Sequence, residues 1–173
     1  MIYQAVHLLA SQMDEAYQSL HERVDGMNEE EFRWEPVPDC WSMHPDVTGR
    51  WLVDYATPDP EPPPFTTIGW RLVHVATCKI MYYEYAYGKA KLTWDELDYP
   101  HTVETTIVLL EDGHTRLRSV LNKLADIDLE APRLTNWGEH WPAWRIFSTM
   151  IFHDLHHGGE IACLRDLYRE LNS

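Results

Sequence analysis

Two histidines four residues apart are the side chains in this sequence best suited to chemistry. His153 and His157 form an H-x-x-x-H pair inside a segment with helical patterning. Residues four apart on a helix share one face, so both imidazoles can reach one metal ion at about 2.0–2.1 Å. His156 lies between them in sequence, points about 100° away from His157 and is not expected to bind the same ion. The pair by itself also fits surface or hydrogen-bonded histidines.

A third histidine lies in the most apolar stretch of the chain. His74 stands between Val73 and Val75, in a segment whose apolar residues predict a helix buried on most faces. A buried imidazole needs a polar partner, and a hydrogen bond is the commoner solution. Bundle cores also build metal sites from inward side chains on facing helices. Three protein ligands with open positions are typical of a catalytic ion, so the histidines favour a catalytic metal site over a structural one.

Four long segments with helical spacing must position these side chains. Apolar residues recur at i, i+3, i+4 and i+7. We predict a short helix over 29–34 and long helices over 2–24, from Thr66 or Thr67 to 87, over 102–124 and over 142–171. No segment alternates convincingly as a strand does. The expected fold is all-α, a four-helix bundle in a single domain of residues 1–173. An up-down-up-down order is the simplest topology, although a long connection permits a crossover.

The connection between the first and second long helices is rich in proline. Residues 36–64 include the run Pro62-Pro63-Pro64 and several other prolines, so they cannot form a regular helix. Loops of this length are uncommon in compact domains unless they serve a function. The aromatic residues Trp41, Trp51 and Tyr55 indicate that the segment packs against the bundle. We expect an irregular excursion over one end of the bundle, either as a lid or as an insertion without a role.

Composition and charge exclude several classes of partner. The net charge of −14 repels a phosphate backbone and no run of Lys or Arg offsets it, so we expect no nucleic-acid partner. Apolar stretches fall well short of the roughly 20 residues that cross a bilayer, and the N-terminus lacks the features of a signal peptide. We therefore expect a cytoplasmic protein without a membrane partner. Its cysteines, Cys40, Cys78 and Cys163, lie far apart and are expected to be reduced packing residues.

The sequence also resembles the DinB-like metalloprotein superfamily over essentially its whole length. The resemblance is carried by Trp34-Glu35-Pro36-Val37-Pro38, Cys40-Trp41-Ser42, His74 and the pair His153-x-x-x-His157. Members characteristically ligate a divalent ion with one histidine of the second helix and the H-x-x-x-H pair. The resemblance therefore implies His74, His153 and His157 as the metal ligands. Zinc and nickel are the leading metals, with iron, manganese and copper as alternatives that three imidazoles also suit.

The sequence departs from the commonest family pattern directly after the second histidine of the pair. Many members have Arg-Gly-Gln there, whereas this chain has Gly158, Gly159 and Glu160. Glu160 lies one helical turn after His157, so it is a candidate hydrogen-bonding partner of a ligand or a general base. The alternative is a carboxylate without catalytic consequence. The Pro-rich excursion is a second departure, and it leaves the substrate open.

The resemblance implies an enzyme that acts on a small-molecule substrate. The DinB-like superfamily includes thiol S-transferases that use bacillithiol or mycothiol. In such an enzyme, a divalent ion lowers the pKa of the low-molecular-weight thiol cosubstrate and so makes the thiol nucleophilic. Trp41, Trp137 and Trp141 are candidate pocket-lining residues, with core packing as the alternative. A metal-dependent hydrolase, a non-catalytic metal- or ligand-binding protein of the stress response, and a purely structural bundle remain as competing readings. The family resemblance also leads us to expect a homodimer.

Overall fold

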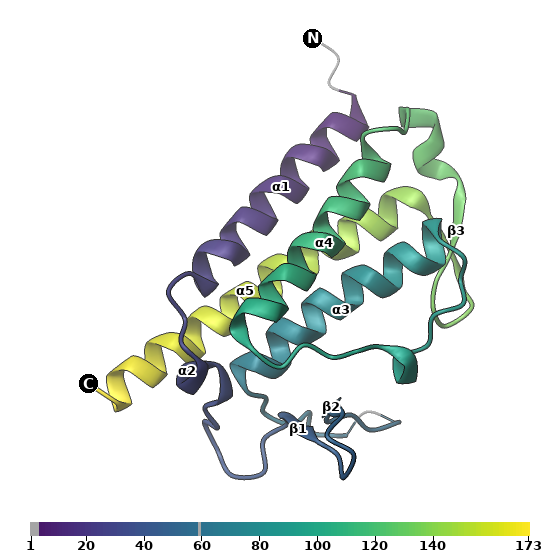
Figure 1. Cartoon of the computed structure of the whole chain (residues 1–173). Helices are drawn as coiled ribbons and strands as arrows, with labels where there is room; N and C mark the ends of the chain where they lie inside the picture. The colour runs from purple at the N-terminus through teal and green to yellow at the C-terminus, as the bar shows by residue number, and fades with distance from the viewer. Residues whose placement is uncertain (1–3, 59) are drawn as a thin grey trace.

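Four long helices carry most of the chain (Figure 1). The computed structural model describes residues 4–58 and 60–173. The helices are α1 (Ala5–Val24), α3 (Ile68–Tyr87), α4 (Val103–Leu121) and α5 (Ala143–Leu171), with a short helix α2 (Glu29–Arg33). The predicted all-α fold is confirmed. The predicted start of the first helix at Ile2 lies outside the described residues.

Side-chain caps explain where three of these helices begin. Asn28 Oδ1 accepts a hydrogen bond from the Glu31 N–H at 2.8 Å, which starts α2. Thr67, rather than Thr66, caps α3, because its Oγ1 accepts from the Trp70 N–H at 3.1 Å. Thr102 caps α4 in the same way. Each cap satisfies a backbone N–H that the first helical turn leaves without a partner.

Contacts at the helix ends fix the direction of each helix. The start of α4 lies beside α2, because the Val103 N–H donates to Glu29 Oε1 at 2.7 Å. The segment that follows α4 lies beside the start of α1, where Asp126 accepts from the N–H groups of Ala5 and Val6 at 3.0 Å. Helix α3 also starts beside α2. Therefore α3 and α4 run parallel to each other, and α1 and α5 run in the opposite direction.

The bundle thus contains a crossover and is not the simple up-down-up-down arrangement. The crossover is the segment 88–102, which connects the end of α3 to the start of α4 and runs back along the length of the bundle (Figure 1). This segment holds the single 3₁₀ turn η1 (Trp94–Glu96), and it packs into the core through the buried residues Leu97 and Tyr99. The Pro-rich segment, in contrast, stays at one end of the bundle.

The Pro-rich excursion contains a short hairpin that the sequence did not reveal. Strands β1 (Met43–Pro45) and β2 (Trp51–Val53) pair antiparallel. The excursion is tied to the start of α3 because the Trp41 N–H donates to the Phe65 carbonyl at 2.7 Å. The connection before α5 similarly holds η2 (Asp126–Glu130) and a hairpin of β3 (Pro132–Leu134) and β4 (His140–Pro142). Strands of three residues are too short to show alternation in the sequence, which is why neither hairpin was predicted.

The long helices pack through two parallel contacts, α1 with α5 and α3 with α4, and one antiparallel contact, α3 with α5. Helix α1 lies along α5, and α3 lies along both α4 and α5. The buried apolar residues form two clusters that adjoin along the bundle. Three buried polar residues, Lys79, His114 and Asp154, lie where the clusters meet on α3, α4 and α5. Among the described residues, no helix has the length and hydropathy that crossing a membrane requires.

Candidate metal centre

The three histidines predicted as ligands lie together between two facing helices. His74 comes from α3, and His153 and His157 come from α5. Their ring centroids are 5.1 Å apart for His74 and His157, 5.4 Å for the two α5 histidines, and 5.6 Å for His74 and His153. A ligating nitrogen at about 2.0–2.1 Å puts the ring centroid about 3.2 Å from an ion, so ligating rings lie about 4.5–5.5 Å apart. The observed spacing is therefore close to that of three rings around one ion.

The individual ligand atoms, however, fall into two groups. The ligand atoms of His74, Cys78 and His153 all lie within 4.8 Å of one another. His157 falls into a second group, which includes Glu160. The division arises because His157 turns Nδ1 toward Glu160 Oε2, 2.7 Å away. Its Nε2 is then the nitrogen left for an ion.

Burial keeps all three imidazoles neutral at neutral pH. Desolvation, followed by the neighbouring histidines, lowers the pKa of His74 to about 3 and that of His157 to about 3. Desolvation and then the charge of Lys79 lower the pKa of His153 to about 4. The neutral imidazole is the form that binds a metal ion, because a protonated ring has no lone pair to donate.

One ring nitrogen of this group has no hydrogen-bond partner. His153 Nδ1 is buried, and no described residue bonds to it. Leaving a buried polar nitrogen unpaired costs about 1–3 kcal/mol, so such an atom calls for an explanation. Several neutral nitrogen donors around it are the donor set that zinc, nickel, copper and iron accept. The residues present therefore fit a divalent ion.

Glu160 holds the far side of the His157 ring. Its Oε2 contacts His157 Nδ1 and also the Arg71 guanidinium, while its Oε1 lies 3.6 Å from the exposed His156. A carboxylate on the outer nitrogen of a ligating histidine fixes the tautomer and orientation of the ring. Glu160 is thus positioned to orient His157, and Arg71 fixes Glu160 in turn.

Cys78 is a residue of this site that sequence analysis missed. Its Sγ lies 3.7 Å from His74 Nε2, and the side chain is buried. Burial raises the pKa of the Cys78 thiol to about 12. The signal was present, since Cys78 follows His74 by four residues and so shares its helical face. Of the other cysteines predicted to pack in the core, Cys40 is buried, but Cys163 is exposed.

A buried ion pair involves Asp154, the residue that follows His153 on α5. Lys79 Nζ on α3 is 2.7 Å from Oδ2 of Asp154 on α5, and both side chains are fully buried. The pair joins the two helices that carry the histidines. Because such a pair needs good geometry to offset the desolvation of both charges, it fixes the position of α3 relative to α5.

Aromatic side chains cover the His74 side of the site. The Trp70 ring stacks on His74 with centroids 5.1 Å apart and an interplanar angle of 8°. Trp41, one of the predicted pocket residues, contacts Trp70 at 5.7 Å rather than any of the histidines. Trp41 therefore supports the site through Trp70, a residue that sequence analysis did not single out.

A second aromatic group covers the His153 side. Tyr82 contacts the His153 ring at 6.5 Å between centroids. Trp137 and Trp141, the other predicted pocket residues, contact Tyr82 at 5.7 and 6.3 Å. Trp137 remains 47% exposed. The structure thus brings both tryptophans near the histidines, one side chain removed from them.

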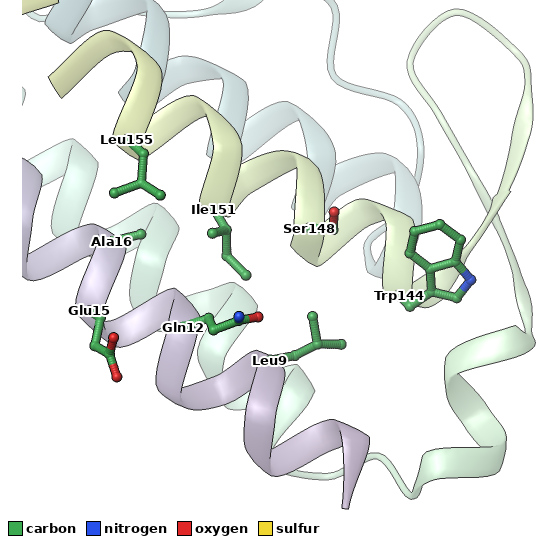
Figure 2. Close-up of a pocket in the computed structure, with 8 residues that line it drawn as sticks. All are labelled: Leu9, Gln12, Glu15, Ala16, Trp144, Ser148, Ile151 and Leu155. Carbon is green, nitrogen blue, oxygen red and sulfur yellow. The ribbon is translucent and has the colours of Figure 1, made fainter. Parts of the chain in front are cut away.

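A cavity lies elsewhere, between α1 and α5. It has a volume of about 570 Å³. Figure 2 shows side chains of α1, such as Leu9 and Gln12, facing Ile151 and Leu155 of α5. None of the predicted ligands lines it, so this cavity is distinct from the candidate metal centre.

Comparison with known proteins identifies the family. The sequence profile of the DinB superfamily matches residues 12–161, a range that includes His74, His153 and His157. The crystal structure of a DinB-like protein from Bacillus cereus ATCC 10987 is similar, with a TM-score of 0.67, 17% identity, and coverage of 96% of this chain and 95% of that chain. A conserved protein from Enterococcus faecalis has a TM-score of 0.56 at 16% identity, over 96% and 98% of the two chains. At these identities the two structures show a shared fold, and no curated protein matches the sequence. Because the matched profile spans most of the chain, the protein belongs to the DinB superfamily.

Proposed function

We propose that this protein binds one divalent metal ion through His74, His153 and His157 and acts as a thiol S-transferase on a small-molecule substrate. The observation that carries the proposal is the cluster of three neutral imidazoles from α3 and α5, with ring centroids 5.1–5.6 Å apart. Zinc and nickel are the leading metals, because both accept imidazole ligands. When bound, the ion would lower the pKa of a low-molecular-weight thiol and so supply a thiolate at neutral pH.

The chain's own residues would orient the ligands and shape the pocket. Glu160 accepts a hydrogen bond from His157 Nδ1, which keeps Nε2 free of a proton. Trp70 covers His74, and Tyr82 covers His153, so both rings are shielded from water. Trp137 is the most accessible of the surrounding aromatic residues named above, and it offers a face to an apolar group of the substrate.

Elemental analysis tests the metal ligands. Tag-free wild-type protein is expected to retain about one equivalent of metal, and His74→Ala and His153→Ala are expected to lose it. His156→Ala is the matched control, because His156 lies on the same helix and is exposed. Wild-type protein without metal, even after reconstitution with zinc or nickel, would contradict the proposal.

Thiol dependence separates the proposed transferase from the alternatives. An electrophilic substrate is incubated with the metal-loaded protein in the presence and absence of a low-molecular-weight thiol. Turnover only with thiol supports S-transfer, whereas turnover without it supports a hydrolase in which the ion activates water. Metal binding without turnover in either condition supports a non-catalytic metal-binding protein, such as one that acts in the stress response.

We further propose that the protein is a cytoplasmic homodimer that associates through the α1–α5 face. All three cysteines are free, as expected for a reducing compartment. Trp144 and Leu155, which line the cavity in Figure 2, are 41% and 53% exposed. Exposed apolar residues grouped around a groove are typical of an interface. Light scattering should give the mass of a dimer for wild type and of a monomer for Leu155→Glu; a wild-type monomer would contradict the proposed dimer.

A further inference from the structure

We propose that Cys78 is a fourth protein ligand of the metal ion, which makes the centre one of three nitrogens and one sulfur. This inference rests on the metal binding proposed above. Cys78 follows His74 by four residues on α3, and His157 follows His153 by four residues on α5. Residues at this spacing share a helical face. Because the helices are antiparallel, Cys78 lies near His153 while His74 lies near His157, and the two pairs supply four ligands.

The separation of Cys78 and His74 is short enough for both to bind one ion. Cys78 Sγ lies 3.7 Å from His74 Nε2 and 3.8 Å from His74 Nδ1, so the His74 ring must turn to direct one nitrogen at an ion that the sulfur also binds. A tetrahedral ion with metal–nitrogen bonds of about 2.0–2.1 Å and a metal–sulfur bond of about 2.3 Å separates nitrogen and sulfur by about 3.6 Å. The ligand atom of His153 lies within 4.8 Å of both, a distance that side-chain rotation can shorten.

Core packing alone explains this arrangement less well. Cys78 does belong to an apolar cluster that includes Tyr82 and Phe147. Its sulfur nevertheless lies beside two imidazoles, and His153 Nδ1 is buried without a hydrogen-bond partner in the part of the chain that the structure describes. A shared ion satisfies the sulfur and the imidazoles together.

A sulfur ligand would change both the metal preference and the accessibility of the ion. A thiolate is a soft donor that favours zinc over manganese, which prefers oxygen ligands. Cys78 would release its thiol proton to solvent when the ion binds. Four protein ligands fill a tetrahedral ion, as in structural sites. A thiol cosubstrate would then have to displace Cys78 or enlarge the coordination shell, so Cys78 affects whether the centre is catalytic.

Substitution with cobalt(II) tests for the sulfur ligand. Tag-free protein is stripped with a chelator and loaded with Co²⁺, and its bound cobalt and absorption spectrum are measured. The wild type is expected to show the intense near-ultraviolet band of thiolate-to-cobalt charge transfer. Cys78→Ser should keep cobalt but lose this band. Cys163→Ser is the matched control and should keep both, because its thiol is exposed and lies outside the centre.

The possible failures are distinguishable. Wild-type protein that holds cobalt without the band overturns the sulfur ligand and leaves the three-histidine site intact. Wild-type protein that binds no cobalt overturns the proposed metal site and this inference with it. If Cys78→Ser does not fold, X-ray absorption of zinc-loaded wild type decides the question. A sulfur scatterer at about 2.3 Å supports the proposal, and a shell of nitrogen and oxygen alone overturns it.

Discussion

The buried pair of Lys79 and Asp154 gives a direct test of how the helices around the site are held together. Among the described residues, Asp154 is the only hydrogen-bond partner of Lys79 Nζ, and Asp154 Oδ1 has none. Both side chains are 0% exposed. Replacing either one alone therefore leaves a charge in the core without a partner. We expect Asp154→Asn, which keeps the shape and removes the charge, to be strongly destabilising.

Two responses of the protein set the size of this effect. If Lys79 stays charged, loss of its partner costs about 3–5 kcal/mol. If Lys79 instead loses its proton, neutralising a lysine with a reference pKa of about 10.4 costs about 4.6 kcal/mol at pH 7. Burial lowers the pKa of Lys79 and Asp154 raises it, so removal of Asp154 favours this second response. Both routes predict that Asp154→Asn lowers the free energy of unfolding by about 3–5 kcal/mol.

A double variant separates the pair from its surroundings. Lys79→Met with Asp154→Leu replaces the two charges by apolar side chains, an exchange that is often neutral or stabilising by about 1–4 kcal/mol. We expect the double variant to be more stable than either of its single variants, measured by urea unfolding of metal-free protein with circular dichroism. Losses that simply add, or a loss below about 1 kcal/mol for Asp154→Asn, would refute the reasoning, because the two charges would then be independent or hydrated.

Three further predictions concern glycines, pH and metal. Gly113→Ala should destabilise by about 1–3 kcal/mol, because a Cβ there would lie 2.7 Å from Lys79 Cβ, whereas Gly159→Ala meets nothing within 4 Å and should stabilise by up to about 1 kcal/mol in urea unfolding. Burial, followed by Lys79, lowers the pKa of His114 to about 4. The unfolded chain, with a pKa of about 6.5, binds the proton first, so His114 alone contributes a loss of about 3 kcal/mol between pH 7 and pH 4, and His114→Gln should lose less stability than wild type over this range by up to that amount. Zinc at 100 times its Kd should stabilise wild type by about 2.7 kcal/mol in thermal unfolding and leave His74→Ala unchanged.

Most helix positions could be predicted because each helix carries its own signals. The caps at Asn28 and Thr102 act within one turn, so they are visible in the sequence. The parallel order of α3 and α4 could not be predicted. A helix of 20 residues, the length of α3, spans about 30 Å, and the segment 88–102 can span more than that when extended. Chain length therefore permitted both topologies, and the burial of Leu97 and Tyr99 selects the crossover.

The same distinction between local and distant signals explains what was found of the site. Spacing of four residues within one helix revealed His153 and His157, and it would have revealed Cys78 beside His74 had thiols been considered with imidazoles. The pairing of Lys79 with Asp154 spans 75 residues, so no local pattern predicts it. In the sequence, Lys79 only interrupts an apolar run. Its role appears when α3 and α5 pack together, since a lysine can remain buried there only with a carboxylate opposite. The histidines of the site can therefore be predicted from the sequence, whereas the ion pair that holds their two helices together can be identified only in the folded structure.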